Sequence, residues 1–159
     1  MARRRGLGWP VVAGLVLAAL LVLVIPLPGG LAPLRPNVLA LVVLWLCLLA
    51  PRPTGLVFAF AVGLAQDAVH GMLLGQNALA LTVIAYAALK LRLRIRAFPP
   101  LQQSAAVFAL LALGEFVVFW IDGVSGHPLT EWTRWLSVVV GAACWPLLAA
   151  ALARYLPRG

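Results

Sequence analysis

Residues 63–79, GLAQDAVHGMLLGQNAL, contain Asp67, one of four acidic residues in the 159-residue chain. An ionised carboxylate at the centre of a bilayer costs about 2.5–3.5 kcal/mol, and less near the surface. Gly63, Asp67 and Gly71 recur at every fourth position, so a helix places them on one face, where small residues let a second helix approach closely. We predict that Asp67 accepts hydrogen bonds from a neighbouring helix and that Gly75 belongs to the same packing and partner-binding region. A ligand-binding or proton-transfer role is the alternative.

Four polar side chains near Asp67 in the sequence could donate those hydrogen bonds: Gln66, His70, Gln76 and Asn77. If Asp67 is such an acceptor, asparagine should largely retain its role and leucine should not. Glu115, beside Gly114 in LLALGEFVVFWID, is the second acid in an apolar run. Two carboxylates at similar depth could share a proton or flank a polar cavity. No spacing brings them together, so separate helix-packing contacts are the simpler hypothesis.

The composition determines which kind of element must hold these residues. Hydrophobic residues make up 64% of the chain and charged residues 10%, against about half and a quarter in an ordinary soluble domain. That much apolar surface requires a lipid solvent, so we predict a single-domain, all-α integral membrane protein. Cys47 and Cys144 lie inside apolar runs as small fillers, so we expect no disulfide and no metal site.

The apolar runs predict six transmembrane helices joined by short connections. Their approximate ranges are 9–27, 37–50, 54–70, 77–91, 103–121 and 132–155. A helix needs about 20 residues to cross the hydrocarbon core, so the range 37–50, bracketed by Pro36 and Pro51, is short for a full span. It would be either a thin span or a re-entrant segment.

The distribution of the cations favours six spans with both termini in the cytoplasm. Ten cations then fall on the cytoplasmic side: Arg3, Arg4, Arg5, Arg52, Lys90, Arg92, Arg94, Arg96, Arg154 and Arg158. Two fall outside, Arg35 and Arg134. This bias follows the positive-inside rule, and it would be lost if residues 37–50 did not cross. Asp122, His127 and Glu131 would then lie in an exposed outer loop.

The block KLRLRIR, residues 90–96, is interpreted as a basic cytoplasmic loop formed by Lys90, Arg92, Arg94 and Arg96. The simpler interpretation is anchoring, with apolar stems in lipid and charged heads among the headgroups. The more specific interpretation is that the block also forms a docking surface for a partner or for anionic membrane lipid. Nucleic acid is not an expected partner, because no soluble segment surrounds the block to form a groove.

Residues that would catalyse a reaction do not form a recognisable pattern. The sequence has no GxSxG motif, P-loop or HExxH motif, and its hydroxyl residues have no base one helical step away. We therefore expect no enzyme activity and no cofactor.

An ordered set of residues resembles the MreD family of rod shape-determining proteins. The resemblance covers residues 33–123, and its motifs are Arg35-Pro36, Trp45, Pro51, Gly55, Gly63-x-x-x-Asp67-x-x-x-Gly71 with Gly75, Tyr86 and Gln102-Gln103. It implies a six-span fold similar to the substrate-binding subunits of energy-coupling-factor transporters.

The resemblance also implies a non-catalytic scaffold of the bacterial cell-elongation complex in the inner membrane. The partner it implies first is MreC, with MreB, RodA and the elongation transpeptidase as further ones. The alternative function, from another class, is a small-molecule-binding membrane transport subunit. It would use a polar outer cavity lined by Asp67, Glu115, Gln66 and Asn77.

Overall fold

A computed structural model describes residues 7–49, 54–71, 73–126, 132–152 and 154 of the chain. These residues form six α-helices and one 3-10 helix: α1 (Trp9–Val24), η1 (Gly29–Leu34), α2 (Val38–Leu49), α3 (Leu56–His70), α4 (Gln76–Ala97), α5 (Pro100–Val124) and α6 (Thr133–Leu152). Several residues of the charge analysis lie outside the described residues, namely Arg3, Arg4, Arg5, Arg52, His127, Glu131 and Arg158.

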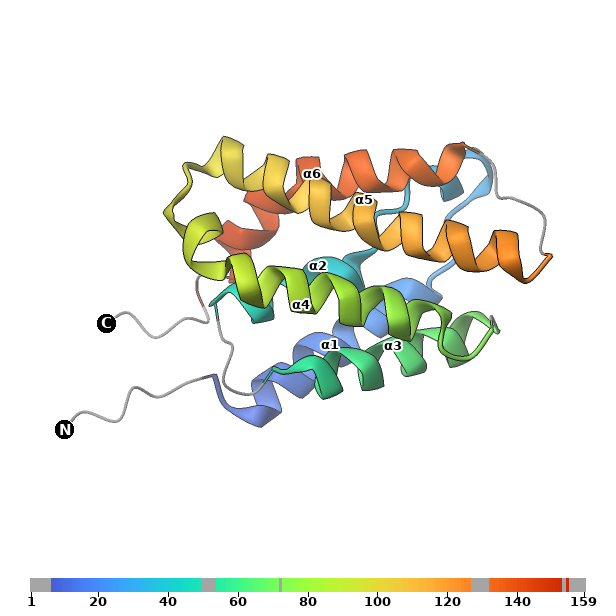
Figure 1. Cartoon of the computed structure of the whole chain (residues 1–159), viewed down its shortest axis with the longest axis horizontal. Helices are drawn as coiled ribbons and strands as arrows, with labels where there is room; N and C mark the ends of the chain where they lie inside the picture. Colours follow the sequence, from blue (N-terminus) through green and yellow to red (C-terminus); the bar gives the residue numbers. More distant parts are fainter. Residues whose placement is uncertain (1–6, 50–53, 72, 127–131, 153, 155–159) are drawn as a thin grey trace.

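Successive α-helices run in alternating directions, so the connections gather at two ends of the bundle (Figure 1). One end holds the α3–α4 turn, the end of α5 and the start of α6. We call it the network end, after the network of polar contacts that lies there. The opposite end, with the α4–α5 turn, is called the basic end. Along the chain, α3 packs on α4, α4 on α5 and α5 on α6.

Helix α2 is the centre of the bundle and contacts α1, α4 and α6. Every residue from 39 to 48 is buried, as expected for a helix that is hydrophobic on all sides. Asn37 caps its start, because its Oδ1 accepts a hydrogen bond from the backbone N–H of Ala40 at 3.1 Å. With 12 residues, α2 is about 18 Å long. It is therefore shorter than a hydrocarbon core of about 30 Å.

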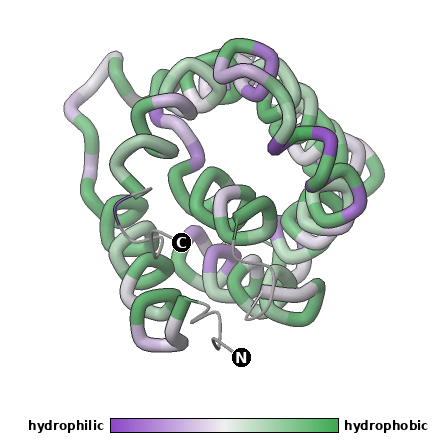
Figure 2. Tube along the Cα trace, turned by 90° about the vertical axis from the view of Figure 1, so that its left-hand side faces the viewer, coloured by the Kyte–Doolittle hydropathy of each residue, from purple (hydrophilic) through white to green (hydrophobic). Residues whose placement is uncertain are grey.

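The chain is largely hydrophobic along its helices (Figure 2), and many large apolar side chains are exposed on the outside of the bundle. Val57, Leu101 and Trp132 are all more than four-fifths exposed, whereas Asp67 is fully buried. Helices α5 and α6 are long and apolar enough to cross a membrane, and α1, α2 and α3 are apolar but shorter. A surface of this kind suits lipid as the solvent.

Two sequence expectations about loops were wrong. Lys90, Arg92, Arg94 and Arg96 lie on the last two turns of α4, which ends at Ala97. They are not in a loop, because Leu, Lys and Arg are good helix formers and the helix ends only before Pro99 and Pro100. Asp122 is likewise inside α5, which continues to Val124.

Candidate functional site

Asp67 lies near the end of α3 and binds the start of α4. Its Oδ2 accepts hydrogen bonds from the backbone N–H groups of Gly75 (2.8 Å) and Ala78 (3.3 Å). Its Oδ1 accepts from both the backbone N–H and the side-chain amide of Asn77, at 3.0 and 2.9 Å. The first N–H groups of a helix have no partner within the helix, and the helix dipole favours a negative charge there. Asp67 therefore caps α4 from a different helix.

Gly63, Gly71 and Gly75 serve the same turn in different ways. A Cβ on Gly63 would lie 2.7 Å from the backbone nitrogen of Ala78 and 2.9 Å from the carbonyl oxygen of Asn77. Gly63 is therefore the point where α3 and α4 touch through their backbones. Gly71 does not continue this packing stripe, since a Cβ there would meet nothing within 4 Å. Its φ of +62° and that of Gly75, +104°, instead allow the two sharp bends of the α3–α4 turn.

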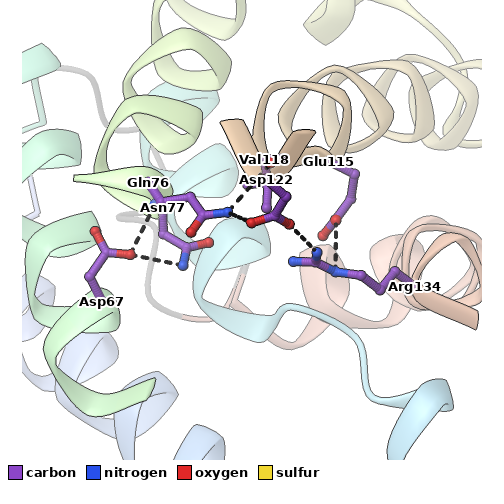
Figure 3. A network of polar contacts seen from close by, with 7 residues as sticks. All are labelled: Asp67, Gln76, Asn77, Glu115, Val118, Asp122 and Arg134. Atoms are coloured by element: carbon purple, nitrogen blue, oxygen red, sulfur yellow. Dashed lines mark hydrogen bonds and ion pairs between the residues drawn. The ribbon is translucent and has the colours of Figure 1, made fainter. Parts of the chain in front are cut away.

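A second set of contacts joins α4 to α5 and α6 (Figure 3). The side-chain amide of Gln76 donates to Oδ1 of Asp122 at 2.6 Å and to the carbonyl oxygen of Val118 at 3.4 Å. Arg134, on α6, donates through Nη1 to Oδ2 of Asp122 at 3.0 Å. Its Nε lies 3.7 Å from Oε2 of Glu115. Arg134 thus places one positive charge between two carboxylates of α5.

Together these residues form what we call the polar network: Asp67, Gln76, Asn77, Glu115, Asp122 and Arg134. It links α3, α4, α5 and α6 at the network end (Figure 3). Gln76 and Asn77 are neighbours in sequence, and one binds Asp122 while the other binds Asp67. Because each of these side chains contacts a group contributed by another helix or its N-terminal turn, the network fixes how the four helices sit against one another.

Asp67 and Glu115 are not in direct contact, although both belong to the polar network. Glu115 lines a small cavity between α2, α4, α5 and α6, together with Asn37, Asn77 and Ser137. The cavity volume is about 20 Å³, and a single water needs roughly 10–15 Å³ on this scale. Asp67 does not line it. The arrangement has room for a water molecule beside Glu115, not for an organic ligand.

Sequence reasoning missed Asp122 and Arg134 as site residues. Asp122 was expected in an exposed loop, but only 4% of its surface is accessible. A signal was present, because Glu115, Val118 and Asp122 are spaced three and four positions apart and so share one face of a helix. Arg134 was treated only as a charge outside the membrane. Of the four side chains expected as donors to Asp67, Asn77 donates to it, together with the backbone of the turn. Gln76 donates to Asp122 instead, and Gln66 and His70 are not among the donors to Asp67 in the described structure.

The basic end has its own polar contact between helices. Gln103, on α5, donates to the carbonyl oxygen of Ile95 near the end of α4 at 3.3 Å. Its Oε1 accepts a hydrogen bond from the indole N–H of Trp145 on α6 at 3.1 Å. Gln103 belongs to the Gln102-Gln103 motif, and it joins α4, α5 and α6, which are three of the four helices that the polar network links at the other end.

The chemistry available to the polar network is hydrogen bonding and charge pairing. Within the described part of the chain, no group of three or more His, Cys, Asp or Glu side chains could hold a metal ion. Each carboxylate of the network accepts from, or pairs with, a group on another helix. The arrangement is suited to holding helices together.

Comparison with known proteins places the chain in a family. The family described as rod shape-determining protein MreD matches residues 3–155. A relative from Haemophilus influenzae, named rod shape-determining protein MreD, is 26% identical over 146 residues, which cover 92% of this chain and 90% of the relative. No solved structure matches the chain. The resemblance inferred from residues 33–123 is thereby confirmed over nearly the whole sequence, and the chain belongs to the MreD family of rod shape-determining proteins.

Proposed function

We propose that this protein is a non-catalytic scaffold of the bacterial cell-elongation complex in the inner membrane. In this proposal it binds MreC, and through the assembled complex it works with MreB, RodA and the elongation transpeptidase. Family membership supports a role in rod-shape determination. The proposal adds the partners, the location and the way in which the chain acts.

The proposed topology has six spans, with the network end facing outward and the basic end in the cytoplasm. Two observations support it. The six α-helices alternate in direction (Figure 1), and five described cations lie at the basic end. Four of them, at positions 90, 92, 94 and 96, are on the last two turns of α4, and Arg154 follows α6. In this topology α2 crosses as a short helix surrounded by longer ones. A fold similar to the substrate-binding subunits of energy-coupling-factor transporters is part of the proposal.

The scaffold proposal rests on the observation that the buried acids hold helices together. Asp67 is fully buried and Asp122 nearly so, and both accept hydrogen bonds from groups on other helices. Charged groups inside a membrane protein are costly and are retained where they have a role. Here that role is to fix the relative positions of α3, α4, α5 and α6. A rigid bundle with a defined outer surface is what a membrane scaffold needs.

The alternative, a small-molecule-binding transport subunit, requires a chamber for its ligand. Binding sites for organic ligands usually enclose about 300–1,000 Å³. The cavity beside Glu115 is far smaller, at about 20 Å³, and Asp67 does not line it. The geometry therefore favours the scaffold over the transport subunit.

The test uses a rod-shaped bacterium whose own MreD gene is deleted. A tagged copy of this chain is produced at native level, cell width is measured, and proteins that co-purify in mild detergent are identified. We expect rod shape to be restored and MreC to be present in the eluate. Asp67→Leu should lose both, because it removes the acceptor of four hydrogen bonds. His70→Ala, an exposed position on the same helix, is the matched control and should keep both.

The scaffold proposal fails if the wild-type chain restores rod shape while MreC is absent from the purified complex. It also fails if Asp67→Leu behaves as wild type in both assays. A vitamin-sized molecule retained through purification would instead favour the transport subunit.

A further inference from the structure

The basic end of the bundle has positive charge without acidic partners among the described residues. Asp67, Glu115 and Asp122 are all held in the polar network at the other end. We call Lys90, Arg92, Arg94 and Arg96, on the last turns of α4, the basic collar. Lys90 has only a local contact, a hydrogen bond to the hydroxyl of Tyr86 at 3.1 Å. The described acids are thus at the opposite end of the bundle from the collar and do not pair with it.

The collar covers the outward side of α4 as two separate rows of cations. An α-helix turns by about 100° per residue, so Lys90 and Arg94 form one row and Arg92 and Arg96 a second row. The two rows lie on either side of Leu93, which is 74% exposed. Ile95 faces the opposite way and is buried in the core. The outward side of α4 therefore presents an apolar residue between two rows of cations.

The α4–α5 turn keeps these charges close to the apolar surface. Only Phe98 and Pro99 separate α4 from α5, and Phe98 and Leu101 are exposed apolar residues on either side of the turn. The first and last cations are six positions apart along the helix, a rise of about 9 Å. The headgroup region on each side of a bilayer is about 5–8 Å thick. The collar thus has the height of a headgroup layer and apolar residues both within it and beyond it.

We propose that the basic collar binds the phosphate groups of anionic phospholipids in the surrounding leaflet. Cations next to an anionic membrane surface attract it, and long Lys and Arg side chains can place their charges among headgroups while their stems remain in apolar surroundings. A protein partner docked on one side of α4 would use a single row. Lipids along the outward side of the helix use both rows, and Leu93 and Leu101 contact their acyl chains.

The test is native mass spectrometry of the full chain in mild detergent, titrated with phosphatidylglycerol or with phosphatidylcholine of the same acyl chains. We expect the wild type to prefer phosphatidylglycerol. The pair variants K90Q/R94Q and R92Q/R96Q each remove one row. At about 1 kcal/mol per cation, each pair should weaken phosphatidylglycerol binding by roughly 25-fold at low ionic strength, given tenfold per 1.4 kcal/mol.

The matched control is R92K/R94K/R96K, which keeps the charge and should keep the lipid preference. If a pair variant fails to fold, the single variants R94Q and R96Q compare the two rows, because each removes one cation from one row. Equal binding of the two lipids by the wild type would overturn the proposal. So would a loss confined to one row, which indicates a one-sided partner, or displacement of the lipid by inorganic phosphate, which indicates a soluble ligand.

Discussion

At the scale of single residues, Asp67 shows how a general expectation becomes specific once its partners are known. The sequence predicts an interhelical acceptor, for which asparagine would be a fair replacement. In the structure three of its four donors are backbone N–H groups, those of Gly75, Asn77 and Ala78. A backbone N–H group can only donate a hydrogen bond, whereas a side-chain amide can rotate to present its oxygen as an acceptor. Asparagine can keep the hydrogen bonds to one of the two oxygens. In place of the second oxygen it has an NH₂ group, a donor that would face backbone N–H donors and make no hydrogen bond with them.

We therefore predict that Asp67→Asn lowers the free energy of unfolding by about 2–3 kcal/mol, since two charge-assisted hydrogen bonds are lost. Asp122→Asn is the matched comparison. Its Oδ1 partner is the side-chain amide of Gln76, which can rotate to offer an oxygen, so we expect a loss of only about 1 kcal/mol. Thermal unfolding in detergent measures both. Equal losses for the two variants would contradict the capping role of Asp67.

The residues that sequence reasoning missed share one physical reason. Asp122 is followed by Gly123 and Ser125, which are typical of loops, and a charged residue at the end of an apolar run suggests that the helix has ended. The helix continues because Asp122 is paired by Gln76 and Arg134. Those partners come from α4 and α6, so no local pattern in the sequence could reveal them. Asp67 was easier to identify because its surroundings are apolar on both sides.

At the scale of helices, one glycine lies at each successive contact between α3, α4, α5 and α6. A Cβ on Gly63 would meet the backbone of α4, on Gly114 the side chain of Ile84, and on Gly141 the side chain of Leu111. Backbone cannot move aside as a side-chain end can. The three contacts therefore differ in how much volume they can accept.

Alanine substitutions at these three glycines should therefore change stability by different amounts, with the largest loss at Gly63. Gly→Ala within a helix gains up to about 1 kcal/mol of helix propensity, whereas overpacking costs about 1–3 kcal/mol. We expect Gly63→Ala to lose about 2 kcal/mol and Gly114→Ala to be near neutral. Gly141→Ala, whose Cβ would lie 3.1 Å from Leu111 Cδ1, should be neutral or slightly stabilising. The readout is thermal unfolding of each purified variant, and a Gly141→Ala loss as large as that of Gly63→Ala would refute the explanation.

The helices themselves were easier to predict than their ends. Each predicted range overlaps one α-helix of the structure, because long apolar runs identify helices that pack in lipid, although α4 and α5 extend beyond their predicted ranges at both ends. The ends depend on local chemistry that hydrophobicity does not report. Hydropathy alone would end α4 near Leu91, yet Arg and Lys continue it to Ala97. The role of Gly71 was also hidden, since a helix face and a left-handed cap both favour glycine.

At the scale of the whole molecule, the chain separates its charges between the two ends of one apolar bundle. The described acids are at the network end, and most of the described cations are at the basic end. The sequence predicts this separation through the positive-inside rule, since it requires only the order of the charges and the number of crossings. It cannot predict that Arg134, one of the exceptions, is held by Asp122 and Glu115.

That separation leads to a prediction about orientation. In a background with Cys47 and Cys144 replaced by alanine, single cysteines are introduced at Ala97 and at Ser125, both exposed positions at opposite ends. A membrane-impermeant maleimide added to whole cells should label Ser125→Cys, and Ala97→Cys only after the membrane is opened. The cations of the basic collar resist translocation, which fixes this direction. If Ala97→Cys is labelled in intact cells, or if both positions are labelled from the same side, α4 and α5 do not cross as proposed, and the basic collar does not lie in the cytoplasmic leaflet.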